Sequence, residues 1–283
     1  MRQDAHWIQR VLAPLWLLAV AFAPAQAGGS GLNVAVVVNS HSADSMALGN
    51  YYRERRQLPP QNIVRISWTG SRTDWTRTQC QNLLVNPLFT ALTERRLAGQ
   101  IQFVVLSMDI PYRVIDGRDV NSTTSVLFYG FKTNDWRSPG ACRISPEGNN
   151  PYFATELAFD SQPASTNGPR FLATMLTAEL LAEAMRTVDR GVASDGAFPT
   201  QTVLLQKTTD PARNVRFPNF DHAILDMHLN GLFPLIATNS NQTSGLSNLF
   251  GMQTGLAHFN VSRDTFVPGA MADSLTSYGG CLF

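Results

Sequence analysis

Polar side chains able to bind a ligand or transfer a proton follow an apolar run at residues 34–38. The next six residues, 39–44, hold a histidine, two serines and an aspartate, and the candidate ligand-binding residues among them are Ser40, His41 and Asp44. Histidine acts as an acid or a base near neutral pH, and hydroxyl and carboxylate groups can orient it or a substrate. The same residue types also cap helices. The segment is therefore either a capped turn or part of a binding site.

A second polar group follows the apolar run at residues 101–107. Asp109 stands at a position where an α/β fold can hold a catalytic carboxylate, and Arg113 is close enough in sequence to pair with it or with an anionic ligand. The alternative is an ion pair that only holds the turn at Pro111. Asp109 and Arg113 are thus candidate ligand-binding residues, and Asp109 is also a candidate catalytic residue.

The end of the chain offers a candidate cysteine nucleophile. A nucleophilic thiol needs a base within hydrogen-bonding distance, and Cys281 with His258 is the pair that this region supplies. A position so near the terminus has weak rigid support, so a free or disulfide-bonded cysteine is the alternative. In an oxidising compartment, Cys80, Cys142 and Cys281 predict one disulfide and one free thiol, and the spacing leaves the pairing open.

The sequence contains no pattern typical of cofactor, metal or nucleic-acid binding. Neither G-x-G-x-x-G nor G-x-x-x-x-G-K-[ST] is present, so we expect no dinucleotide or P-loop phosphate site and no cofactor. His222 and His228 are six residues apart, unlike the i, i+4 histidines of a zinc-binding helix, and we expect no metal. The 22 basic and 21 acidic residues leave a formal net charge of +1, which argues against a nucleic-acid partner.

The first 27 residues have the order of a cleavable secretory signal. Arg2 and Arg10 precede or flank an apolar run at residues 11–23, and the small residues of a cleavage site follow at 25–27. A membrane-spanning helix needs about 20 apolar residues, and this run is shorter. We expect residues 1–27 to be a signal peptide, the mature chain to have no transmembrane segment, and the protein to be secreted or periplasmic.

Strands and helices alternate along the rest of the chain. Apolar runs of strand length occur at residues 34–38, 63–67, 101–107, 171–175, 202–207 and 232–238, with helical spacing between most of them. A run that is apolar at every position indicates a strand buried on both faces, as in a parallel sheet. We therefore predict a single α/β domain over residues 28–283, with a doubly wound, mostly parallel sheet and helices on both faces.

Two segments depart from this alternation. The stretch at about residues 131–169 is rich in Asn, Pro, Gly and Ser, and we expect a long excursion over the surface. Near the end, Pro268 and Gly269 predict a turn, followed by the start of a helix at residues 270–276. Because the chain stops at Phe283 soon after two glycines, we expect it to be C-terminally incomplete.

The carboxyl ends of parallel strands are where ligands bind in open α/β sheets. In the predicted fold, three segments follow such strand ends or strand-end turns. They are residues 40–44, 109–113 and 268–280. We expect these segments to form the ligand or partner surface.

Several separated segments together resemble a family of secreted bacterial proteins of unknown function. They are, in order, VVVNSHSADSMALGNYYRERRQLPPQNIVRI, FVVLSMDIPYRVIDG, NPYF, TTDPARNVRF and FVPGAMADSLTSYGG. The resemblance implies an α/β fold and export, and it brings no activity and no catalytic residues. The architecture is also similar to that of caspase and gingipain-like cysteine peptidases, which implies a Rossmann-like or caspase-like three-layer sandwich. No His-Gly step ends a strand here, so the latter similarity concerns the fold alone.

Three functions are consistent with these residues. The first is an exported α/β protein with a ligand or partner surface at the carboxyl ends of the strands. The second is a hydrolase of the cysteine-peptidase-like kind that uses Cys281 and His258. The third is a non-catalytic module of a cell-surface assembly.

Overall fold

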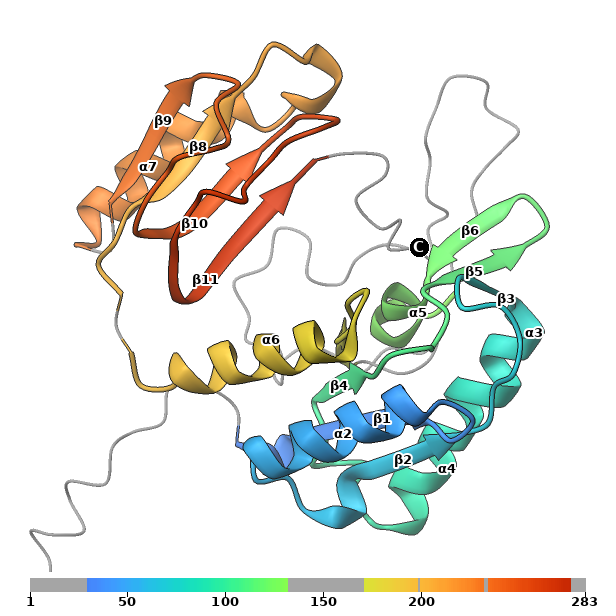
Figure 1. Cartoon of the computed structure of the whole chain (residues 1–283). Coiled ribbons are helices and arrows are strands. Elements are labelled where there is room, and N and C mark those ends of the chain that lie inside the picture. The colour runs from blue at the N-terminus through green and yellow to red at the C-terminus, as the bar shows by residue number, and fades with distance from the viewer. Residues whose placement is uncertain (1–29, 132–170, 198, 232–233, 276–283) are drawn as a thin grey trace, which may run out of the picture.

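The computed structural model describes residues 30–131, 171–197, 199–231 and 234–275 (Figure 1). Within these residues the strands form two four-stranded parallel sheets and one three-stranded sheet, and helices join many of the strands. The predicted α/β class with mostly parallel strands is confirmed. The parallel strands are divided between two sheets, a division that local sequence periodicity does not indicate.

The first sheet has the strand order β2-β1-β4-β7, and all of its strand pairs are parallel. All six residues of the central strand β1 are buried, as its continuous apolar sequence predicts. The strands are β1 (Val34–Asn39), β2 (Ile63–Ile66), β4 (Phe103–Leu106) and β7 (Leu172–Met175).

Helices cover both faces of β1. Ala35 and Val37 pack on one side, against leucines of the helical segment that leads into α4, and the alternate residues of β1 face α2 on the other side. Gly49 makes the approach of α2 close, since a Cβ at this position would lie 2.2 Å from Val38 Cγ1. The helices are α2 (Ala43–Arg55), α3 (Arg77–Cys80), the π-helical η3 (Gln81–Val85) and α4 (Asn86–Glu94).

A small three-stranded sheet lies next to this core. Its strand β3 pairs in parallel with β5, and β5 forms an antiparallel hairpin with β6 that turns at Gly117, where φ is +61°. Trp75 of β3 is 2% exposed and belongs to the same buried cluster as Ala35 and Val37, which joins the small sheet to the core of the first one. The Trp75 Nε1 donates to Oγ1 of Thr123, the residue after β6, at 3.1 Å. The strands are β3 (Asp74–Thr76), β5 (Arg113–Asp116) and β6 (Asp119–Ser122).

Two further helices border the first sheet. Helix α5 (Thr123–Tyr129) contacts the edge strand β7, and α6 (Leu181–Ala193) packs against α2. Helix α6 also contacts β11, which belongs to the second sheet. In Figure 1, α6 lies between the two large sheets.

The second sheet has the order β11-β10-β8-β9, again with parallel pairs only. The helix expected at residues 270–276 is wrong, because strand β11 runs through the expected turn. Gly269 has φ +83° inside β11, and the register between β10 and β11 shifts in the same region. The elements are β8 (Val203–Lys207), η6 (Pro211–Arg213), η7 (Phe217–Asn219), α7 (Phe220–Leu229), β9 (Leu235–Asn239), β10 (Leu249–Thr254) and β11 (Phe266–Ser274).

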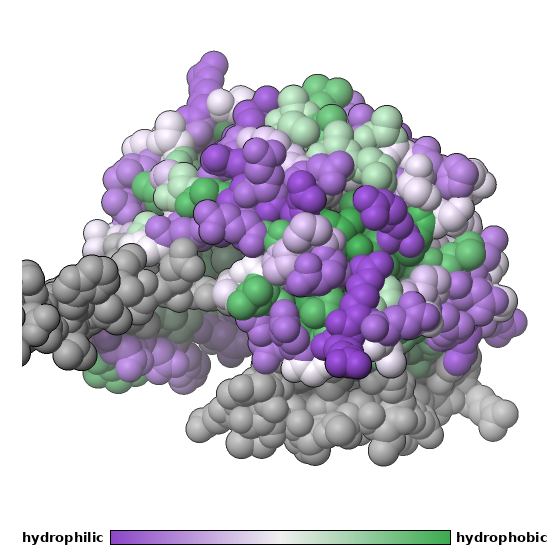
Figure 2. Space-filling view, turned by 90° about the horizontal axis from the view of Figure 1, so that it is seen from below, coloured by the Kyte–Doolittle hydropathy of each residue, from purple (hydrophilic) through white to green (hydrophobic). Residues whose placement is uncertain are grey.

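The face of the molecule that lies underneath in Figure 1 carries both hydrophilic and hydrophobic residues. Figure 2 shows hydrophilic residues spread over this face, with hydrophobic residues in several separate patches between them. Among the helices that the structure describes, none has both the length and the apolar character needed to cross a membrane.

Candidate functional site

The carboxyl ends of β1 and β4 bring two of the predicted segments together. These strands are neighbours in the sheet, with Val37 opposite Leu106, so the turns that follow them are adjacent. Ser42 Oγ donates a hydrogen bond to Asp109 Oδ2 at 2.5 Å. Ser42 is also the N-cap of α2 and accepts from the Ser45 N–H at 3.0 Å. The segment is thus both a capped turn and part of a polar cluster.

The buried amide of Asn39 joins three strand ends. Its Nδ2 donates to the carbonyl oxygens of Trp68, at 2.9 Å, and Asp109, at 3.1 Å, while Oδ1 accepts from the N–H groups of Trp68 and His41. Asn39 is 3% exposed, and these bonds link the chain after β1 to the chain after β2 and after β4. This amide therefore sets the relative position of the three turns.

Asp109 occupies a backbone conformation that is uncommon for a residue other than glycine. Its φ is +58°, a left-handed value that costs energy for L-residues and that, when observed, is a reason to suspect a functional site. The Asp109 side chain is 18% exposed, and its Oδ1 lies 2.6 Å from Arg72 Nη2. The carboxylate thus lies between a hydroxyl donor and a guanidinium.

Of the two partners considered for Arg113, an anionic ligand and Asp109, the structure does not pair it with Asp109. Arg113 begins β5, where the parallel register places Asp74 of β3 opposite it, and the two side chains form an ion pair. The hydrogen bond from Arg113 holds the pKa of Asp74 below its usual value. Arg72, on the segment after β2, takes the predicted place of Arg113 beside Asp109.

The remaining predicted residues of this edge differ in their roles. His41 is exposed, and its Nε2 lies 2.8 Å from Ser67 Oγ, at the end of β2. The Ser40 hydroxyl donates to the Ile66 carbonyl at 2.8 Å, so it holds the backbone. Asp44 is exposed in the first turn of α2, where a negative charge suits the helix dipole.

Sequence reasoning missed two side chains of this cluster, Ser67 and Arg72. Ser67 is the last residue of the run at residues 63–67, which was predicted to be a strand, and Arg72 lies shortly after it. The rule that ligands bind at the carboxyl ends of parallel strands applies to this strand as well. It would have pointed to both residues.

The predicted cysteine and histidine pair cannot be placed as a pair. His258 is exposed in the segment between β10 and β11, and Cys281 lies outside the described residues, as does Cys142. Cys80 is a buried free thiol, and burial raises its pKa to about 12, so it is protonated at neutral pH. Pro268 lies in β11 of the second sheet and so does not join the strand ends of the first one.

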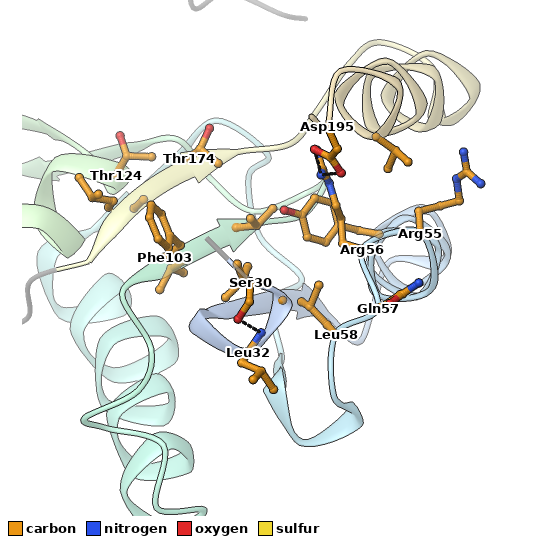
Figure 3. A pocket seen from close by; sticks show the side chains of 18 of the residues that line it. Ser30, Leu32, Arg55, Arg56, Gln57, Leu58, Phe103, Thr124, Thr174 and Asp195 are labelled. Carbon is orange, nitrogen blue, oxygen red and sulfur yellow. Dashed lines mark hydrogen bonds and ion pairs between the residues drawn. The ribbon is translucent and has the colours of Figure 1, made fainter. Parts of the chain in front are cut away.

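A pocket of about 1090 Å³ lies over one face of the first sheet (Figure 3). Its floor comes from residues near the start of three strands, such as Val34, Phe103 and Leu172, so it is distinct from the cluster at their carboxyl ends. No motif in the sequence indicated it, because its lining comes from six separate segments of the chain.

Comparisons with known proteins give no relative: no protein-family model, no curated protein and no solved structure matches the chain. Among the described residues, no group of three or more His, Cys, Asp or Glu side chains is placed to hold a metal ion. Function must therefore be argued from the geometry of the sites themselves.

Proposed function

We propose that the chain is an exported α/β protein that binds a small ligand with a carboxylate or phosphate group at the carboxyl ends of β1, β2 and β4. The observation that carries this proposal is the Asp109 carboxylate, held in a left-handed turn between Ser42 and Arg72. Residues held in such strained backbone conformations cluster at binding and active sites.

The chemistry of the cluster suits an anionic group. The Arg72 side chain is 50% exposed, and its planar guanidinium carries five N–H donors in a fork that matches carboxylate and phosphate oxygens. Asp109 Oδ1 forms an ion pair with one of its nitrogens, Nη2. On the same edge, His41 and Ser67 add an imidazole and a hydroxyl, both exposed. The cluster thus offers directed donors to a ligand oxygen.

Export is the second part of the proposal. It is supported by the charged, apolar and small-residue order of the first 27 residues. The test is to express the full coding sequence in a bacterium and measure the N-terminus of the protein in the periplasm and medium by mass spectrometry. We expect it to be Gly28, and a protein that stays uncleaved inside the cell would contradict this part.

Hydrolysis is the alternative function that one contact favours. The 2.8 Å distance between His41 Nε2 and Ser67 Oγ is right for a base and a serine nucleophile. Such a base is normally oriented by a third group, and among the described residues no hydrogen bond joins the second ring nitrogen of His41 to a carboxylate. Binding is therefore the function that the geometry supports better. If a fluorophosphonate labels Ser67 in the wild type and fails to label it in His41→Ala, hydrolysis becomes the better supported function.

The binding proposal is tested with inorganic phosphate and succinate as probes in a thermal unfolding assay. A ligand at about a hundred times its dissociation constant stabilises a protein by about 2.7 kcal/mol, which gives a rise in Tm of several degrees. We expect at least one probe to stabilise the wild type and to lose its effect in Arg72→Gln.

A matched control is Arg77→Gln. Arg77 also pairs with an aspartate, Asp116, and its side chain is 48% exposed, close to the value for Arg72. We expect Arg77→Gln to keep the stabilisation. No effect of either anion on the wild type, or equal loss in both variants, contradicts the proposal. If Arg72→Gln keeps the stability of the wild type but no longer binds the anion, the result favours ligand binding over the role of a non-catalytic assembly module.

A further inference from the structure

Among the residues that the structure describes, one face of the first sheet is only partly covered, and the pocket in Figure 3 lies there. Helix α2 packs over β1 and α6 packs against α2, and neither of these two helices covers the part of this face formed by β4 and β7. The register places Val34, Phe103 and Leu172 in one row across three strands. Leu172 is 37% exposed although it lies in a strand, so an apolar surface faces the pocket.

The floor of the pocket is largely apolar, and its walls mix apolar and polar side chains. Val105 lies in the next row on the same face as Phe103, and Tyr52, Leu58 and Phe128 contribute from α2, the loop after it and α5. The three strands span about 10 Å at the usual spacing of 4.8 Å between strands. Ligand pockets typically combine such an apolar lining with a few placed polar groups.

One end of the pocket carries an arginine held in an ion pair. Arg56 Nη1 lies 2.6 Å from Asp195 Oδ1 and 2.5 Å from Oδ2, and Figure 3 shows this pair at the end of the pocket opposite Thr124. Gly191 of α6 makes room for the guanidinium, since a Cβ there would lie 2.8 Å from Arg56 Nη2.

Among the ionisable groups that line the pocket, Arg56 is the one best placed to bind an anion. Arg55 pairs with Asp189 and points away from the pocket in Figure 3. Burial raises the pKa of Tyr52, which is therefore neutral at physiological pH. The Asp195 side chain is 45% exposed at the end of α6, so it can turn to water and yield Arg56 to a ligand anion. Exposed ion pairs are weak, which makes this exchange inexpensive.

We propose that this pocket binds a single-chain amphiphile with an anionic head group, such as a fatty acid. The head group binds Arg56, and the hydrocarbon chain lies over Phe103, Val105 and Leu172. This site is separate from the cluster around Asp109, and it takes a ligand of a different class. Each site can therefore fail its test without affecting the other.

The test uses sodium dodecanoate as the probe in isothermal titration calorimetry, with acetate and 1-dodecanol as comparisons. We expect dodecanoate to bind and acetate to fail, because acetate has the head group without the chain. In Arg56→Gln we expect dodecanoate binding to weaken about tenfold or more, as for loss of a hydrogen bond to a charged group. Arg55→Gln is the matched control, and it should bind like the wild type.

Two further variants separate loss of the site from loss of the fold. Leu172→Asp places a charge on the apolar floor and should abolish dodecanoate binding, whereas Leu229→Asp, at a 72% exposed position of α7, should not. Asp195→Asn removes the competing carboxylate and should tighten binding severalfold, a gain that misfolding cannot produce. The proposal is overturned if dodecanoate does not bind the wild type, if Arg56→Gln equals Arg55→Gln, or if Asp195→Asn does not tighten binding.

Discussion

The contribution of the Asn39 amide to the stability of the first sheet can be tested with one nearly isosteric substitution. Asn39→Asp replaces the Nδ2 group, which donates to the carbonyls of Trp68 and Asp109, by an oxygen. Each neutral hydrogen bond contributes about 0.5–1.5 kcal/mol, so loss of both costs about 1–3 kcal/mol. At 3% exposure a carboxylate facing two carbonyl oxygens is also poorly solvated. We expect a total loss of about 3–5 kcal/mol in the free energy of unfolding at pH 7.

The loss should depend on pH in a defined direction. Burial and the two carbonyls favour the protonated form of the introduced carboxyl, so its pKa is higher in the folded than in the unfolded protein. A raised folded-state pKa means that the variant is least destabilised below the unfolded pKa of about 3.9 and loses stability as the pH rises toward the folded pKa. For each unit by which folding raises this pKa, the free energy of unfolding of Asn39→Asp, relative to that of the wild type, falls by about 1.4 kcal/mol between low and high pH.

The assay is urea unfolding followed by tryptophan fluorescence, which reports on this sheet because Trp68 and Trp75 both lie in its core. Asn39→Ala is the matched control, since it removes the same hydrogen bonds without adding a titrating group. The difference in the free energy of unfolding between Asn39→Ala and the wild type should be independent of pH. A loss below about 1 kcal/mol in both variants, or an equal pH dependence in both, would refute the role assigned to the amide.

Three further outcomes follow from packing and burial. Gly49→Ala should destabilise the protein by about 1–3 kcal/mol in the same urea assay, because the added Cβ would lie 2.2 Å from Val38 Cγ1; an unchanged midpoint would contradict the close approach of α2. Thr254→Val should be neutral or stabilising by up to about 1 kcal/mol, since Thr254 Oγ1 is buried without a hydrogen-bond partner among the described residues. Destabilisation would instead indicate that the hydroxyl is satisfied. Cys80, whose burial raises its pKa to about 12, should resist iodoacetamide at pH 8 until urea unfolds the protein, as peptide mapping by mass spectrometry would show.

Much of the local structure could be predicted from the sequence. The buried strands β1 and β4 are continuous apolar runs, and their parallel pairing follows from burial on both faces. The sequence did not predict β3 or the small sheet, because three residues carry too little periodicity to indicate a strand. It also assigned a helix where β11 forms, since turn residues at Pro268 and Gly269 are compatible with an irregular strand.

The candidate site was predicted in part. Asp109 and the segment after β1 come together because they follow neighbouring parallel strands, which is a rule of topology. The sequence suggested Arg113 as a partner of Asp109 because the two are close along the chain. In the structure, the pairing of β3 with β5 places Arg113 beside Asp74 instead. Arg72 reaches Asp109 only because the turn after β2 folds back over the same edge.

By itself, the sequence determined the elements that depend on near neighbours along the chain. Apolar runs indicate strands, and the serine and aspartate that follow the first run indicate the start of α2. Only the tertiary structure decided which strands share a sheet, which arginine lies beside Asp109, and that described residues from separate segments form a pocket beside Arg56. These features depend on contacts between residues far apart in the chain, whose free energies are set by three-dimensional packing and leave no periodic trace in the sequence.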